Sequence, residues 1–251
     1  MALSHYHSLF IAYAFAMLLW FALSKWLPQI WSEKKEPISF NKPWLEIAFA
    51  FVAVILTILI GQAYMKWGFF SEKGSLGQVG GALNQAIIFS PFLGLLFFRK
   101  HSLQTAWLPT AKIGWRVACG LLIAFLTIAV FRFSREGAVG YFKLIQEVYH
   151  PQNLSYLVQV LGEDLAIAIL FVRLRAAIGL KASIILVASL FAAGHIPALL
   201  AKGWALEEMG SLILDTLLGT GILYFVARSR DIWWFWMVHF AMDMMQFYAV
   251  G

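Results

Sequence analysis

The 251-residue chain is 61% hydrophobic and only 13% charged, and its mean hydropathy is +0.77. A soluble domain has about half of its residues apolar and about a quarter charged, so this composition excludes a soluble globular protein. The single cysteine, Cys119, excludes an intrachain disulfide and a Cys-rich zinc site. The net charge of +6 suits loops that meet anionic lipid headgroups rather than a nucleic acid. The sequence therefore predicts an all-α, polytopic membrane helical bundle, with residues 1–251 forming a single transmembrane domain.

Eight apolar segments are each close to the ~20 residues that a bilayer-spanning helix needs. In chain order, they cover residues 8–27, 45–64, 82–98, 113–133, 154–172, 182–201, 210–227 and 232–250. Ser90 and Pro91 interrupt the third segment, so we expect a kink there. A mixed polar linker separates the fourth segment from the fifth.

The basic residues predict how the chain crosses the bilayer. Most Lys and Arg residues fall in the loops that follow the first, third, fifth and seventh segments. Because basic loops stay on the cytoplasmic side, both termini are expected on the exterior of the cell membrane. In this topology Glu163, His195, His239 and Asp243 lie within about a turn of one depth below the outer surface. Side chains at one depth can meet, which makes these four candidates for a common site.

Glu163 and Asp164 stand next to each other inside the apolar run LGEDLAIAILFVRL. An ionisable side chain at bilayer depth costs about 2.5–3.5 kcal/mol and usually faces a protein interior or a hydrated cavity. Adjacent residues on a helix point about 100° apart, so the two acids are not expected to point at one spot. One is expected to carry the chemistry while the other supports it. The later apolar segments offer His195, His239 and Asp243 as partners.

Each of these later residues also has a purely structural interpretation. His239 and Asp243 share a helix face, so they can satisfy each other, and a lone His195 can be a structural hydrogen-bonding group. Together with Glu163, they can remove a proton from water or hold a zinc ion. The chain has no HExxH and no GxS-type nucleophile motif, which disfavours a site-2-type zinc protease and a rhomboid-like serine mechanism.

Three short patterns then follow one another along the chain. They are the acidic pair Glu163-Asp164, the FxxxH pattern of Phe191 and His195, and the HxxxD pattern of His239 and Asp243. This order resembles the CAAX protease and bacteriocin-processing family of intramembrane proteases, which includes the type II CAAX prenyl endopeptidases. The resemblance covers roughly residues 161–247 and implies a catalytic core at about 154–250. It implies that Glu163 activates the attacking water. The assisting catalytic residues would be His195, His239 and Asp243, and the supporting residues Asp164 and Phe191.

The sequence departs from the family pattern in the first motif. The family usually has EExxxR, whereas here Asp164 replaces the second glutamate and Ala168 stands at the arginine position. Arg173 and Arg175 follow on the same segment, and we expect both to reach the membrane interface. Asp215 is expected near the start of the seventh segment, where the helix dipole favours an acid.

The resemblance implies an intramembrane endopeptidase that cuts a membrane-anchored, lipidated or exported protein or peptide near the membrane surface. Its expected partners are this substrate and the lipid bilayer, with no nucleic acid. No cofactor is expected; in a metal-dependent enzyme, zinc would be held by Glu163, His195 and His239. Two alternatives stay open. One is a non-proteolytic member of the same fold, such as a bacteriocin-immunity or partner-binding scaffold, and the other is a small proton-coupled transporter.

Overall fold

The computed structural model describes residues 2–31, 38–74, 76–136, 140–194, 196, 200 and 206–248. Within these residues the chain forms nine α-helices and no strand. The helices are α1 (Ala2–Trp26), α2 (Pro43–Trp67), α3 (Gly77–Phe98), α4 (Ile113–Glu136), α5 (Tyr141–Val148), α6 (Leu154–Ile178), α7 (Leu180–Ala193), α9 (Leu206–Ser229) and α10 (Ile232–Tyr248). Three short 3₁₀ helices join them: η1 (Pro28–Ile30), η2 (Leu103–Ala106) and η3 (Pro151–Asn153). The predicted all-α bundle is confirmed.

Five of the described helices are long and apolar enough to cross a membrane, namely α1, α2, α3, α4 and α9. The 25-residue α6 is as long but carries two acids and two arginines, while α7 is a shorter apolar helix and α10 has 17 residues. Each of the eight predicted segments corresponds to one of these helices, although the predicted ends of the sixth and eighth segments lie outside the described residues. The chain is a multi-pass membrane protein.

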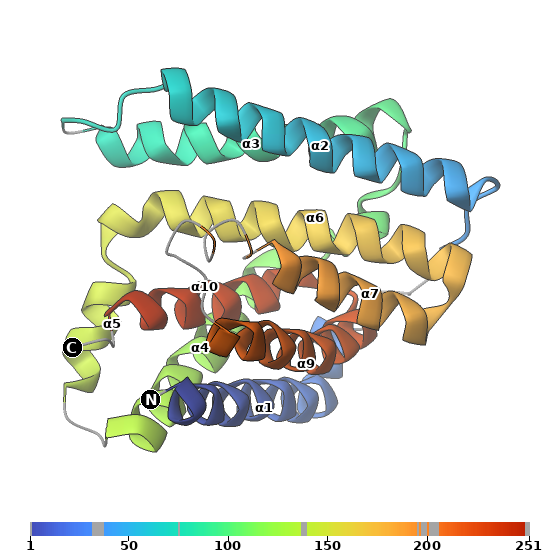
Figure 1. Ribbon diagram of the computed structural model, residues 1–251. Coiled ribbons are helices and arrows are strands. Elements are labelled where there is room, and N and C mark those ends of the chain that lie inside the picture. The colour runs from blue at the N-terminus through green and yellow to red at the C-terminus, as the bar shows by residue number, and fades with distance from the viewer. Residues whose placement is uncertain are drawn as a thin grey trace.

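The helices are arranged around α6. Figure 1 shows α2 and α3 lying side by side as a layer along one side of α6, with α7 and α10 on its other side. The helices α1, α4 and α9 lie beyond α10, and α1 packs against both α4 and α9. Because α6 contacts α2, α3, α7 and α10, its polar side chains meet protein on most sides.

The linker expected between the fourth and fifth segments contains the short helix α5. Leu144 and Val148 are buried where α5 packs against α4 and α10. Phe142, on the other hand, is 80% exposed, as suits an aromatic side chain at a membrane interface. Eight residues give too short a pattern for a helix to be distinguished from a loop in the sequence.

The third segment forms one helix that runs through Pro91. Proline lacks an N–H, so it cannot donate to the carbonyl of Ile87 one turn earlier. The hydroxyl of Ser90 donates to that Ile87 oxygen instead, at 2.7 Å. Ser90 therefore satisfies the backbone of its own helix, and the helix continues past the proline.

Glycines allow two pairs of helices to approach closely. A Cβ at Gly162 would lie 2.4 Å from Cγ of Phe89, where α6 meets α3. A Cβ at Gly120 would lie 2.6 Å from the carbonyl oxygen of Trp234, where α4 meets α10. Small residues at helix crossings let backbones approach in membranes, where packing rather than hydrophobicity drives association. Gly162 directly precedes Glu163, so this packing also sets the position of the acidic pair.

A buried cluster of charges joins α6 to α2 and α3 near one end of the bundle. Glu46 is 3% exposed, and its Oε1 accepts from Nη2 of Arg99 at 2.6 Å and from Nε at 3.1 Å. Oε2 of Glu46 lies 3.9 Å from Nε of Arg173, and the Arg173 guanidinium also faces the ring of Phe40 at 5.4 Å. The expectation that Arg173 reaches the interface is wrong, because Arg173 is 0% exposed. The free-energy cost of placing a cation inside the bundle is lower when a carboxylate lies beside it than when the cation faces lipid.

His101 completes this cluster. Its Nδ1 lies 3.0 Å from Nη2 of Arg173, and because a guanidinium only donates, Nδ1 is the acceptor. The ring proton is then on Nε2, which lies 3.7 Å from Oε2 of Glu46. A neutral His101 bridges the arginine and the glutamate, whereas protonation of Nδ1 would break the bond from Arg173.

We predict that His101 makes the stability of the protein depend on pH. Burial lowers the pKa of His101 below its ordinary value of 6.5, against the opposite influence of Glu46. The unfolded chain therefore takes up this proton first as the pH falls. The stabilisation of the folded protein by neutral His101 is fully present above about pH 6.5. It is lost as the pH falls through the depressed pKa of His101. Unfolding midpoints in detergent between about pH 8 and pH 5 should decline more for the wild type than for His101→Gln, and parallel curves would contradict this role.

Candidate active site

Helices α6 and α10 bring together an acid and an imidazole that are both buried. Asp164 is 3% exposed and His239 is 7% exposed, and His239 Nδ1 lies 2.9 Å from Oδ1 of Asp164. Because an ionised carboxylate only accepts, Nδ1–H is the donor, and a neutral imidazole then has its lone pair on Nε2. Asp164 thus orients the ring and fixes its tautomer.

Two further acids lie close to His239. Glu163, His239 and Asp243 each offer one oxygen or nitrogen atom, and these atoms lie within 4.8 Å of one another. Nε2 of His239 is 3.6 Å from Oδ2 of Asp243. The Asp243 side chain is 30% exposed while that of His239 is 8% exposed, so the site is more open on the side of Asp243.

Glu163 and Asp164 of α6 both lie beside His239. The sequence predicts instead that these adjacent acids do not point at one spot. Asp164 binds Nδ1, and Glu163 joins His239 and Asp243 in the second cluster. The angular separation of neighbouring helical residues does not prevent this, because an imidazole presents its two nitrogens on different edges. One ring can therefore meet both acids.

Gln159 holds Glu163 in place from the same helix. Its Nε2 donates to Oε1 of Glu163 at 2.8 Å, across the one-turn spacing that places residues four apart on one helix face. The sequence contains a signal for this contact, since Gln159 is a polar residue one turn before the acidic pair in an apolar helix.

Aromatic rings enclose the imidazole of His239. Phe235 stacks on it from one turn earlier in α10, with ring centroids 5.4 Å apart and planes at 26°. Phe191 of α7 meets the same ring edge-on at 6.2 Å. The first residue of the FxxxH pattern therefore lies at the site. The histidine of that pattern, His195, lies outside the described residues.

The start of α10 is fixed by a buried ion pair. Asp231 Oδ1 accepts from the backbone N–H of Trp233 at 2.9 Å, as an N-cap residue does. Its Oδ2 binds Nη1 of Arg116 on α4 at 2.5 Å, and these side chains are 0% and 3% exposed. This anchor sets the register of α10 and with it the position of His239.

One oxygen of Asp164 has no hydrogen-bond partner among the described residues. This atom, Oδ2, is buried. One turn further along α6 stands Ala168, which is 0% exposed and occupies the position where the family pattern has its arginine. An arginine there would be spaced to reach Asp164, and the alanine offers no donor.

The described donors also fit a divalent metal. Zinc in proteins is bound by His nitrogen and Asp or Glu oxygen at about 2.0–2.2 Å, and atoms within 4.8 Å of one another can surround one ion at such distances. Among the described residues the fitting set is Glu163, His239 and Asp243. The set expected from the sequence is Glu163, His195 and His239. Glu163 and His239 belong to both sets, Asp243 is an additional possible ligand, and His195 lies outside the described residues.

Asp215 has a different partner from the one expected. Helix α9 begins at Leu206, so Asp215 lies in its third turn rather than near its start. Its Oδ1 accepts from the hydroxyl of Tyr6 on α1 at 2.8 Å. This bond joins α1 to α9, and a phenol rather than the helix dipole stabilises the acid.

Residues 153–245 match the family model described as "Rce1-like: Type II CAAX prenyl endopeptidase Rce1-like". The match confirms the resemblance carried by the three motifs, and it contains every candidate site residue. No curated protein and no solved structure matches the chain. The family that the model describes is one of proteases, and this similarity supports a peptidase acting on a protein or peptide.

We predict that the anchor of α10 contributes strongly to stability. Asp231→Ala removes the N-cap and leaves Arg116 buried without its carboxylate, which should lower the free energy of unfolding by about 3–5 kcal/mol. The matched control is Glu147→Ala, which removes the exposed pair with Lys143 at 3.7 Å and should cost no more than about 0.5 kcal/mol. Chemical unfolding in detergent measures both losses. A loss at Asp231 as small as that of the control would contradict the anchor.

Proposed function

We propose that this chain, whose residues 153–245 match a family of type II CAAX prenyl endopeptidases, is an intramembrane endopeptidase. The observation that carries the proposal is the buried Asp164–His239 pair with two further acids beside it. A carboxylate next to an imidazole can accept a proton from water and return it to a leaving group.

Glu163 is the proposed general base. It takes a proton from a water molecule held between its carboxylate and Nε2 of His239, and the resulting hydroxide attacks the carbonyl carbon of the scissile bond. The proton on Glu163 then passes to the leaving amine as the C–N bond breaks. Gln159, bonded to Glu163 at 2.8 Å, keeps the carboxylate aimed at the water.

The imidazole is proposed to assist from the other side. Asp164 stabilises positive charge on His239, so the ring can hold a proton while negative charge develops on the carbonyl oxygen. Asp243, 3.6 Å from Nε2, orients the ring and the water. His195 is proposed from its motif as a second imidazole beside the oxyanion. If a metal is bound, Glu163, His239 and Asp243 would hold it, and it would polarise the carbonyl and the water.

The proposed substrate follows from the proposed orientation. With both termini outside the cell membrane, the site opens toward the exterior, and Glu163 lies within the outer half of α6. A prenylated CAAX protein is presented from the cytoplasm, so this orientation favours an exported or surface-anchored protein or peptide as the substrate.

We predict that Glu163→Gln lowers cleavage at least about 10²-fold, because a general base contributes about 10²–10⁴-fold and the amide cannot accept the proton. The control is Asp215→Asn, an acid of α9 bonded to Tyr6 and separate from the proposed site. Each protein is reconstituted in vesicles with a mixture of solubilised membrane proteins, and new N-termini are quantified by mass spectrometry. New N-termini that form equally with Glu163→Gln and with the wild type would overturn the proposal.

A non-proteolytic role is the second candidate, and one observation favours it. Ala168 leaves the buried Asp164 Oδ2 without a donor among the described residues. In that case neither the wild type nor Glu163→Gln would generate new N-termini, and folded protein of both kinds would show no hydrolysis.

We further predict that cleavage needs no metal. A zinc chelator should leave the rate of N-terminus formation unchanged, and elemental analysis of purified protein should find well under one zinc per chain. One equivalent of zinc that is lost in His239→Ala, together with inhibition by the chelator, would instead establish the metal-dependent mechanism.

A further inference from the structure

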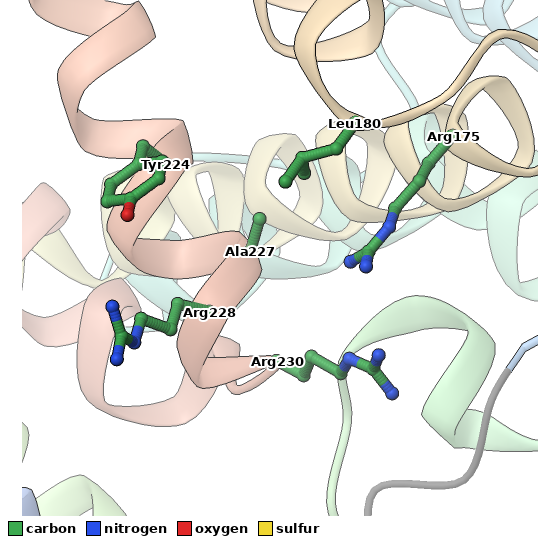
Figure 2. Close-up of a pocket in the computed structure, with 6 residues that line it drawn as sticks. All are labelled: Arg175, Leu180, Tyr224, Ala227, Arg228 and Arg230. Carbon is green, nitrogen blue, oxygen red and sulfur yellow. The ribbon is translucent and has the colours of Figure 1, made fainter.

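A hollow lined by arginines lies away from the candidate active site. It has a volume of about 350 Å³ and is formed where α6 ends, α7 begins and α9 ends. Its lining residues are Arg175, Leu180, Tyr224, Ala227, Arg228 and Arg230 (Figure 2). Half of these described lining residues are arginines and none of the six is acidic.

Two of the arginines face one gap. In Figure 2, Arg175 from the last turn of α6 and Arg230 from the link between α9 and α10 extend into the space beside Ala227. Burial lowers the pKa of Arg230, and the charge of Arg175 lowers it further. Two cations that lie close enough to repel each other are stabilised by an anion placed between them.

The third arginine behaves differently. Figure 2 shows Arg228 extending to the other side of Ala227, and its guanidinium lies over the ring of Phe21 at 5.7 Å. Arg228 therefore packs against α1, whereas the other two arginines border the gap. It provides a matched control of equal charge in the same hollow.

The backbone at Arg230 defines where its side chain starts. Arg230 has a φ of +50°, the left-handed conformation that commonly ends a helix, and its N–H donates to the carbonyl of Val226 at 2.8 Å. The link between α9 and α10 is therefore a tight turn, and Arg230 extends from it toward the gap (Figure 2).

We propose that Arg175 and Arg230 bind a phosphate group in this hollow. Guanidinium groups bind phosphate with paired, directional hydrogen bonds, and basic pockets between membrane helices bind anionic headgroups. Leu180 and Tyr224, which are 37% and 48% exposed, provide an apolar border suited to the glycerol and acyl parts of a phospholipid. The group comes either from an anionic phospholipid or from a soluble phosphate. This proposal does not depend on the proposed peptidase activity.

The experiment uses the full chain and two probes. Native mass spectrometry of detergent-purified protein counts retained phosphatidylglycerol against phosphatidylcholine. Thermal unfolding compares inorganic phosphate with chloride at equal ionic strength. Each is carried out on the wild type, on the double variant Arg175→Gln/Arg230→Gln and on Arg228→Gln.

We expect the wild type to retain phosphatidylglycerol preferentially, with about a tenfold loss in the double variant and no loss in Arg228→Gln. A soluble phosphate is identified as the source by two results together. Both lipids are retained equally, and inorganic phosphate stabilises the wild type and Arg228→Gln but not the double variant. The proposal is overturned if neither probe distinguishes the double variant from the wild type, or if Arg228→Gln loses as much binding as the double variant.

Discussion

Charged side chains inside an apolar bundle must find partners within the protein, because lipid offers none. This constraint explains why α6 lies among four other helices. Toward one end its acids meet His239 of α10, and toward the other Arg173 meets Glu46 of α2. The same helix is thereby attached to both sides of the bundle, and the polar groups that would be costly in lipid instead specify which helices pack together.

The Asp164–His239 bond also gives the site its chemical asymmetry. One edge of the imidazole is bound to the buried carboxylate of Asp164, while its Nε2 lies 3.6 Å from the partly exposed Asp243. Glu163 lies beside His239 and Asp243. Asp164 orients the ring, whereas Glu163 is the acid proposed to hold the attacking water, so two neighbours in the sequence receive different roles. Phe235 and Phe191 shield this ring and lower the local dielectric, which strengthens each of these interactions.

The apolar segments suffice to predict eight of the nine described helices. The motif order names four residues that lie around His239, namely Glu163, Asp164, Phe191 and Asp243. The hydrogen bond of Asp164 to Nδ1 of His239 could not be predicted, because it depends on the rotation of α10. That rotation is constrained by Asp231 and Arg116, which are 115 positions apart. The sequence alone predicts an interfacial Arg173, because its partner Glu46 precedes it by about half of the chain. Contacts such as Gln159–Glu163, by contrast, follow from helical spacing and could have been found in the sequence.

The most direct measurement is ¹⁵N magnetic resonance of histidine-labelled protein in lipid bilayers, with His239→Gln used to assign the His239 signals. The bond to Asp164 predicts a protonated Nδ1 and, in the neutral ring, a bare Nε2 near neutral pH, with a dipolar contact from Nδ1–H to the Asp164 carboxylate. A ring that carries its proton on Nε2 alone, with no contact between Nδ1 and Asp164, would contradict the site as described.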